Sequence, residues 1–206
     1  QFASYFLFLF YGAYFVLLKA VAAVSGASDF ALSFLKDPTA FYLIGRFVLG
    51  VIPGVASVWL LAKSAGRFFS PRIGLLAAGM LGACLLHSQH SHYIYVDIPL
   101  TFAVILLFHQ IFCWLETPSS MALLKVGAIF GWCVAVKYTA VYLFTAIVLA
   151  SLFVTEKRPV QKIKSIVLIG LVSVAMYALI SPYSFLDWAN FSSQVAGQSQ
   201  ARGYWG

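Results

Sequence analysis

Charged residues are scarce in this sequence, and acidic ones are the scarcest. Only 9% of the 206 residues are charged, and just six residues are Asp or Glu, whereas a typical soluble domain has about 25% charged residues. So few charges cannot cover the surface of a globule in water, which excludes an ordinary soluble domain. Cysteines are also few. Cys84, Cys113 and Cys133 lie in apolar stretches without metal-ligand spacing, so we expect them to serve packing.

Apolar and aromatic residues are abundant instead. Hydrophobic residues make up 62% of the chain, and the mean hydropathy is +0.93. A chain in lipid must satisfy its own backbone hydrogen bonds, which helices do. We therefore predict an all-α, polytopic transmembrane bundle of about seven membrane helices. The predicted spans are 4–24, 41–62, 73–87, 98–115, 121–136, 139–154 and 165–181. The third, fifth and sixth are short for a perpendicular crossing.

The net charge of +7 comes from residues in short connections between the apolar spans. This distribution follows the positive-inside rule and does not indicate a nucleic-acid partner. If the helices alternate in direction, one side collects most of the cations, and we predict that it faces the cytoplasm. Its cations are Lys63, Arg67, Arg72, Lys125, Lys157, Arg158, Lys162 and Lys164. The opposite, outer side has fewer, among them Arg46, Lys137 and Arg202.

The segment 86–100, LHSQHSHYIYVDIPL, is the most informative stretch on the predicted outer side. It leads to Asp97, which opens an apolar helix. A carboxylate there can act as a base, orient a hydroxyl group or coordinate a cation. Asp97 followed by Pro99 is also a good helix start, in which the aspartate caps the free N–H groups. The two roles can coexist.

Three histidines precede Asp97 in this segment. His87, His90 and His92 are spaced i, i+3 and i+5, so they do not share one helical face. A metal site would need an irregular loop, and hydrogen bonding at the membrane interface is the simpler interpretation. We therefore predict no metal ligands, although a divalent metal stays open as a cofactor.

Arg46 and Lys137 sit near the outer ends of the second and fifth predicted spans. Both side chains can snorkel to the lipid headgroups. Alternatively, two cations beside an outer carboxylate would hold the phosphate of a lipid-linked substrate. Arginine would do so through its planar fork and lysine as a point charge.

We predict one transmembrane domain over residues 1–206. Its last segment, 182–206, is amphipathic and aromatic, and we expect it to lie along the outer surface as an interfacial helix. The chain starts almost directly on an apolar helix, without an initiator Met or a signal-peptide pattern. We therefore expect it to be an internal fragment of a larger protein.

Four stretches, in this order, resemble the GT-C superfamily of lipid-linked membrane glycosyltransferases. Within it they resemble the dolichyl-phosphate-mannose protein mannosyltransferase-like and aminoarabinose transferase-like group. The first is YLIGR, ending at Arg46, together with the later RIGLLAAGML (72–81). The others are SHYIYVDIPLTF (91–102), AIFGWCVAVKYTAVYLF (128–144) and SPYSFLDWANF (181–191). Together they cover most of the chain from about 41 to 206.

The resemblance implies a GT-C-like helical fold and a defined reaction. A sugar would pass with inversion from a polyprenyl-phosphate carrier to a protein, lipid or glycan acceptor. The reaction would take place on the non-cytoplasmic face of a bacterial inner membrane or of the ER membrane. The resemblance also implies that the main catalytic acid lies in an outer loop before Gln1.

The same resemblance implies roles for individual residues. Asp97 corresponds to the family's second outer acidic residue, which would position the acceptor, a metal or the catalytic loop. Lys137 and Arg46 would face the carrier phosphate and stabilise the charge that develops on it. His92 and Tyr138, next to these residues, are second-tier candidates.

Two other functions fit a helical membrane protein. A transporter or flippase would also place polar residues at one mouth of the bundle, but it predicts inverted repeats and ionisable residues near mid-membrane. No repeat is found, and Lys19 and His109 are the main buried candidates. A non-catalytic membrane subunit would leave the outer cluster without a role.

Overall fold

Almost every described residue is helical. The structure is a computed structural model that describes residues 2–154 and 158–201, and no β-strand occurs among them. Four helical stretches are long and apolar enough to cross a membrane: α1 (Phe2–Ala20), Thr39–Phe68, α7 (Asp97–Glu116) and α10 (Pro159–Ile180). Two shorter apolar stretches are α8 (Ser120–Val136) and Tyr138–Phe153. The predicted all-α membrane bundle with some short helices is thus confirmed.

Several stretches are built from more than one element. Thr39–Phe68 joins α3 (Thr39–Arg46), a π-helical turn η1 (Phe47–Val51) and α4 (Ile52–Phe68). Tyr138–Phe153 joins a 3₁₀ helix η2 (Tyr138–Leu143) to α9 (Phe144–Phe153). The third predicted span divides into α5 (Pro71–Gly82) and α6 (Leu85–His90). The remaining helices are α2 (Ala27–Lys36), α11 (Tyr183–Leu186) and α12 (Trp188–Ala201).

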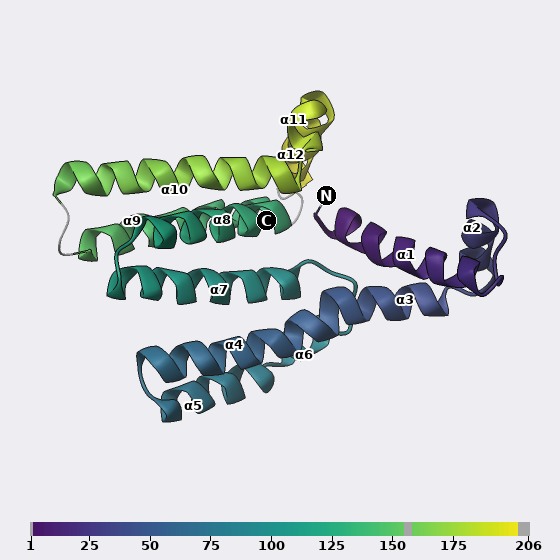
Figure 1. Ribbon diagram of the computed structural model, residues 1–206, viewed down its shortest axis with the longest axis horizontal. Coiled ribbons are helices and arrows are strands. Elements are labelled where there is room, and N and C mark those ends of the chain that lie inside the picture. Colours follow the sequence, from purple (N-terminus) through teal and green to yellow (C-terminus); the bar gives the residue numbers. More distant parts are fainter. Residues whose placement is uncertain (1, 155–157, 202–206) are drawn as a thin grey trace.

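The helices of the bundle run along one common direction. In Figure 1 they lie side by side in the order α5, α4, α7, α8 and α10, and these neighbours are in contact. Helices α1 and α2 lie at the far end of the long axis, beside α3 (Figure 1). An aromatic cluster joins these three helices, and the Tyr11 hydroxyl donates to the carbonyl of Phe41 at 3.1 Å.

The most extensive helix–helix contact is between α8 and α10. A methyl group on Gly131 would collide with the backbone carbonyl oxygen of Ser173. The Ser173 hydroxyl donates to the carbonyl of Gly127 at 2.9 Å. Small residues let helix backbones approach this closely in lipid, where van der Waals contact and interhelical hydrogen bonds hold helices together. The adjoining core is fully buried at Leu107, Val126 and Ile147, which come from α7, α8 and α9.

The polar residue in the middle of α7 serves packing between helices. His109 Nδ1 lies 2.9 Å from the hydroxyl oxygen of Ser64 on α4, and the Phe68 ring packs against the imidazole. Such a bond between two membrane helices satisfies polar groups that lipid cannot. His109 therefore has a structural role, which removes one of the two buried candidates for a transport path.

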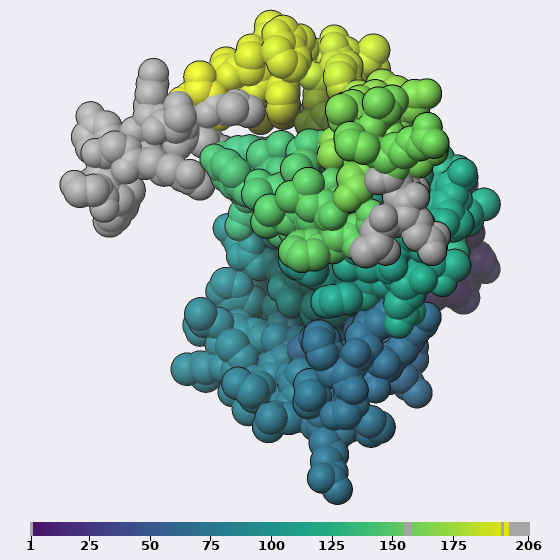
Figure 2. Space-filling view, turned by 90° about the vertical axis from the view of Figure 1, so that its left-hand side faces the viewer, coloured from purple at the N-terminus to yellow at the C-terminus, as the bar shows by residue number. Residues whose placement is uncertain are grey.

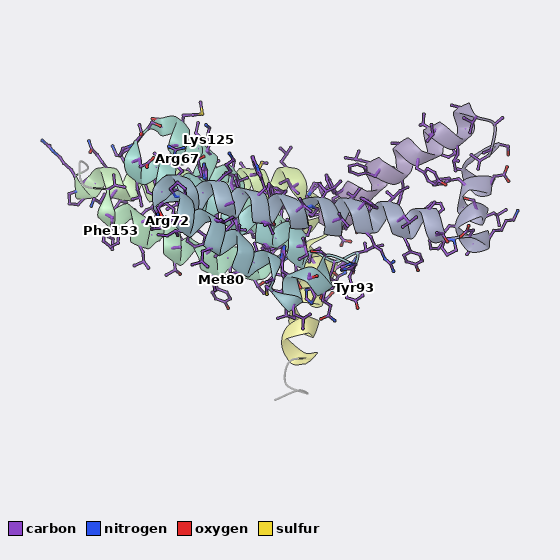
Figure 3. All side chains as sticks on the ribbon, turned by 90° about the horizontal axis from the view of Figure 1, so that it is seen from below. Arg67, Arg72, Met80, Tyr93, Lys125 and Phe153 are labelled. Carbon is purple, nitrogen blue, oxygen red and sulfur yellow. The ribbon has the colours of Figure 1, made fainter. Side chains whose placement is uncertain are left out.

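The two ends of the bundle differ in charge. In Figure 3, Arg67, Arg72 and Lys125 lie at one end, whereas Tyr93 lies toward the other, as the alternation of spans predicts. Figure 2 looks onto the first end and shows the yellow α12 running across the bundle axis. Of the predicted loop cations, Lys157 and Arg202 lie outside the described residues. The predicted interfacial segment 182–206 is helical at Tyr183–Leu186 and Trp188–Ala201.

Candidate active site around Asp97 and Lys137

Asp97 and Lys137 form an ion pair. The Nζ of Lys137 donates to Oδ1 of Asp97 at 2.7 Å, and the side chains are 37% and 27% exposed. The two residues are 40 positions apart in the chain. Sequence reasoning expected them on the same side of the membrane, and the fold brings them into contact.

The backbone at the end of α8 presents Lys137. Helix α8 ends at Val136, and Lys137 has an extended conformation before η2 begins at Tyr138. Its N–H still donates to the carbonyl of Cys133 at 3.0 Å. The cation therefore lies at the carboxyl end of a helix, where the helix dipole favours positive charge.

Asp97 does not cap α7 in the expected way. The N-cap residue is Val96, which makes no side-chain capping bond, and Asp97 is the acidic residue of the first turn. The capping interpretation is corrected, because the carboxylate turns toward Lys137 instead of the free N–H groups. A negative charge in the first turn is still favoured by the helix dipole.

A histidine approaches the other oxygen of this carboxylate. His90, the last residue of α6, places Nδ1 at 3.5 Å from Oδ2 of Asp97. The ring of Tyr95 packs edge-on against the His90 imidazole, with 6.1 Å between ring centroids. Asp97 is therefore held between Lys137 and His90. Sequence reasoning missed this role, because the segment 86–100 alone does not reveal which histidine turns toward Asp97.

The other two histidines have different partners. His87 is buried, and its Nε2 lies 3.3 Å from the carbonyl oxygen of Gly54. His92, the second-tier candidate, is bonded within its own segment, with Nδ1 at 2.8 Å from the carbonyl oxygen of Ser88. Within residues 2–154 and 158–201, no cluster of His, Cys, Asp and Glu could hold a metal ion. The described histidines thus hold the segment in place.

A π-helical turn within the helix Thr39–Phe68 packs against the segment that leads to Asp97. The π-helical turn η1 accommodates Pro53, which has no backbone N–H and would clash in a regular helix. A methyl group on Gly50, within this turn, would collide with the carbonyl oxygen of Ser91. On Gly54 it would lie 2.7 Å from the Ser91 hydroxyl oxygen. The close approach at both glycines sets the path of the chain toward Asp97.

Arg46 remains apart from this ion pair. It ends α3 and is exposed, and it takes part in none of the ion pairs found among the described residues. Its neighbour Gly45 lies against the side chain of Ile94, in the segment leading to Asp97. Arg46 thus follows a residue that contacts the segment leading to Asp97.

An apolar pocket of about 400 Å³ lies among four helical elements of the bundle. It is bounded by α1, by the η1–α4 region, by the first turns of α7 and by Trp132 of α8. Pro99 is two positions beyond Asp97, and Phe102 follows one turn later. The other lining residues are Phe2, Phe6, Val48, Leu49, Ile52, Pro53 and Ala56. The pocket therefore offers hydrocarbon surface along the first turns of the helix that Asp97 begins.

Comparison with known families adds to this geometry. Residues 39–185, from the start of α3 into α11, match the family described as dolichyl-phosphate-mannose-protein mannosyltransferase. The chain belongs to this mannosyltransferase family. The matched stretch contains Arg46, Asp97, Lys137 and Tyr138. No curated protein and no solved structure matches the chain.

Membership of the mannosyltransferase family makes the chain a membrane glycosyltransferase. The geometry shows what its paired residues can do. A lysine ammonium has three N–H donors, and Asp97 takes one of them. The others are available to an anionic ligand. One carboxylate oxygen of Asp97 accepts from Lys137 and the other faces His90, so Asp97 holds Lys137 in position.

Three further carboxylates of the mannosyltransferase chain have local partners. The hydroxyl and backbone N–H of Ser25 donate to Asp29 and hold the pKa of that carboxyl below its ordinary value. The side-chain hydroxyl and the backbone N–H of Thr39 lower the pKa of Asp37 in the same way, and the N–H donates to Asp37 at 3.0 Å. Asp187 accepts from the Asn190 amide at 2.7 Å. These contacts stabilise turns and helix ends.

Proposed function

We propose that this protein transfers a sugar from a polyprenyl-phosphate-linked donor to a protein, lipid or glycan acceptor on the non-cytoplasmic face of its membrane. The observation that carries the proposal is the ion pair of Lys137 with Asp97 at the start of α7, a helix whose first turns also line an apolar pocket. A lipid phosphate needs both features at once, because it joins an anion to a hydrocarbon chain. The family match supports sugar transfer as the reaction.

Lys137 would bind the donor phosphate. As the bond between the sugar and the phosphate oxygen breaks, negative charge grows on the phosphate, and an ammonium group held in place stabilises it. Asp97 keeps Lys137 in position. Arg46, which has no ion-pair partner among the described residues, would supply the second cation. The isoprenoid chain would lie in the apolar pocket beside Pro99 and Trp132.

This arrangement separates two tasks of an inverting transfer. The acceptor oxygen attacks the sugar carbon from the face opposite the leaving phosphate, so the base that takes its proton belongs on that opposite face. Asp97 contacts Lys137, the residue proposed to bind the phosphate. Asp97 would therefore act on the leaving-group side as a positioning residue. A separate carboxylate would serve as the base.

The distribution of charge supports the proposed face. Arg67, Arg72 and Lys125 lie at the end of the bundle away from Tyr93 (Figure 3). Cationic loops favour the cytoplasm, which would leave the segment around Tyr93 and Asp97 on the outer side. The helix α12 leaves the end of α10 across the bundle axis (Figure 1), as an interfacial helix would.

Transfer of radiolabelled sugar from a polyprenyl-phosphate sugar by the purified protein tests the proposal. The wild-type protein should release free lipid phosphate and label an acceptor fraction in equal amounts. The variant Lys137→Ala should lose this transfer. Lys125→Ala, at the other end of the bundle, is the matched control and should keep it. Wild-type protein that binds no lipid phosphate and transfers no sugar would refute the proposal.

A further inference from the structure

The contact between Lys137 and Asp97 joins two opposite charges that largely cancel. The ammonium nitrogen and the carboxylate oxygen are 2.7 Å apart, so an anion that approaches Lys137 also meets the negative charge of Asp97. A phosphate there would gain hydrogen bonds from the ammonium group, but repulsion from the carboxylate offsets much of its attraction to the cation. An additional positive charge beside Asp97 would remove this opposition.

His90 lies where such a charge is needed. Its Nδ1 is 3.5 Å from Oδ2 of Asp97, whereas Lys137 bonds the other oxygen, Oδ1. Histidine gains or loses its charge between about pH 5 and about pH 8. With His90 neutral, the three side chains together have no net charge, and with His90 protonated their net charge is positive. A single carboxylate separates the two basic groups, so their charges act over a distance comparable to the Debye length of about 8 Å at physiological ionic strength.

The surroundings of His90 suit a group that exchanges protons. Its side chain is 36% exposed at the end of α6, so water reaches the imidazole. The Tyr95 ring packs edge-on against the imidazole and restricts its orientation. His87 and His92 differ, because they face the backbone carbonyls of Gly54 and Ser88. Among the ion pairs of the described residues, His90 is the one histidine that reaches a carboxylate.

Other charged residues of the helices around α6 lie elsewhere or keep their charge. Arg67 on α4 and Arg72 on α5 lie at the opposite end of the bundle from Tyr93 (Figure 3). Lys63 is one turn before Arg67 on α4, and Glu116 pairs with Arg67 from the end of α7. Arginine stays charged in proteins, so Arg46 in α3 would affect the binding of an anion equally at every pH. Asp97 and Tyr95 are thus the titratable side chains seen in contact with His90.

We propose that His90 takes up a proton when the phosphodiester of a lipid-linked donor binds to Lys137, and so links donor affinity to the pH of the compartment that the site faces. The proposal rests on the proposed function, because it places a phosphate on Lys137. His90 acts through Asp97 as a positioning residue, since its positive charge offsets that of the carboxylate. The proton comes from the solvent and stays on the imidazole, so no covalent bond of the donor changes.

The direction of the pH dependence follows from linkage. The bound phosphate favours the protonated imidazole, and protonation in turn favours the binding of phosphate by the same factor. The additional affinity is therefore present at low pH and is lost as the pH rises through the range in which His90 of the complex releases its proton. Because His90, Asp97 and Lys137 are partly exposed, water screens the coupling, and we expect a change in Kd of about two- to fivefold.

Binding of a lipid phosphodiester to the purified protein at several pH values tests the proposal. The probe is dolichyl phosphate carrying mannose, because a diester keeps one negative charge whereas a phosphate monoester titrates near about pH 6. At constant ionic strength, the Kd of the wild type should rise about two- to fivefold from about pH 5 to about pH 8. Calorimetry in two buffers of different ionisation enthalpy should show that binding takes up a fraction of a proton at about pH 6.5.

Variants of His90 locate the proton. His90→Gln cannot take up a proton, so its Kd should be independent of pH and equal to the high-pH Kd of the wild type. His90→Lys carries a charge throughout and should bind the probe at about pH 8 as tightly as the wild type does at about pH 5. His92→Gln loses only a bond to the carbonyl of Ser88, and this matched control should keep the pH dependence of the wild type.

Each other outcome has a definite meaning. Wild-type protein that binds the probe with the same Kd at every pH and takes up no proton would overturn the role of His90 and leave the proposed function standing. This measurement needs no variant. The same conclusion follows if the Kd falls as the pH rises, or if His90→Gln keeps the pH dependence of the wild type. Wild-type protein that binds no lipid phosphodiester at any pH would overturn both proposals.

Discussion

Lys137 Nζ lies 2.7 Å from Asp97 Oδ1, and His90 Nδ1 lies 3.5 Å from the other oxygen of the same carboxylate. Asp97 therefore links three elements: the end of α6, the start of α7 and the residue that follows α8. The ion pair is about one third exposed, so water screens it in part. Its value lies in orientation, because it fixes the position of the Lys137 ammonium group.

Loss of either partner should reduce sugar transfer. In Lys137→Ala the phosphate loses its cation, and removing one such stabilising donor costs about 10²- to 10³-fold in kcat. Asp97→Asn keeps the side-chain shape but loses the charge that holds Lys137, so we expect a smaller loss. Initial transfer rates, with folded protein checked by size-exclusion chromatography, measure both. Wild-type rates in both variants would contradict the site.

His90 and His92 should differ although both lie in one short segment. His90→Ala removes the contact with Oδ2 of Asp97 and should lower transfer about two- to fivefold, as expected for a partly exposed ionic contact. His92→Ala removes only a bond to the carbonyl of Ser88 and serves as the control. Transfer rates of the two variants decide the matter. A greater effect at His92 would show that the second-tier expectation from the sequence was right.

Gly50 should not tolerate a side chain. In Gly50→Ala the new methyl group meets the backbone carbonyl of Ser91, so the segment leading to Asp97 must shift. We expect a loss of stability of about 1–3 kcal/mol, typical of overpacking. Gly79→Ala is the control, because nothing lies within 4 Å of the added carbon, and it should gain up to about 1 kcal/mol in a helix. Thermal unfolding in detergent compares the two. Equal stability of the variants would contradict the close approach at Gly50.

The sidedness of the bundle can be measured directly. Tyr93 and Arg72 are exposed and lie toward opposite ends (Figure 3). In a background with the exposed Cys84 replaced by serine, Tyr93→Cys should react with a membrane-impermeant thiol reagent in intact cells or sealed ER vesicles turned lumen-out. Arg72→Cys should react only after the membrane is permeabilised. The reverse pattern would invert the proposed orientation.

Local properties made much of the fold predictable from the sequence. The segments that form α7 and α10 are apolar over the length needed to cross a membrane. Such segments form helices because lipid offers no hydrogen-bond partners to the backbone. The division near residues 83 and 84 and the π-helical turn at Phe47–Val51 were not predicted. The π-helical turn contains Gly50, which packs against the carbonyl of Ser91, a contact between distant parts of the chain.

The candidate site, like the fold, was predictable from the sequence in some features and not in others. Sequence alone determined that Asp97 and Lys137 are among the few charged groups at the ends of apolar helices on one side, because polarity and helix length act locally. Only the tertiary structure decided that they touch and that His90, not His92, approaches the same carboxylate. The contact between Lys137 and Asp97 spans 40 positions of the chain, and helix packing sets it through close approaches that no local pattern encodes.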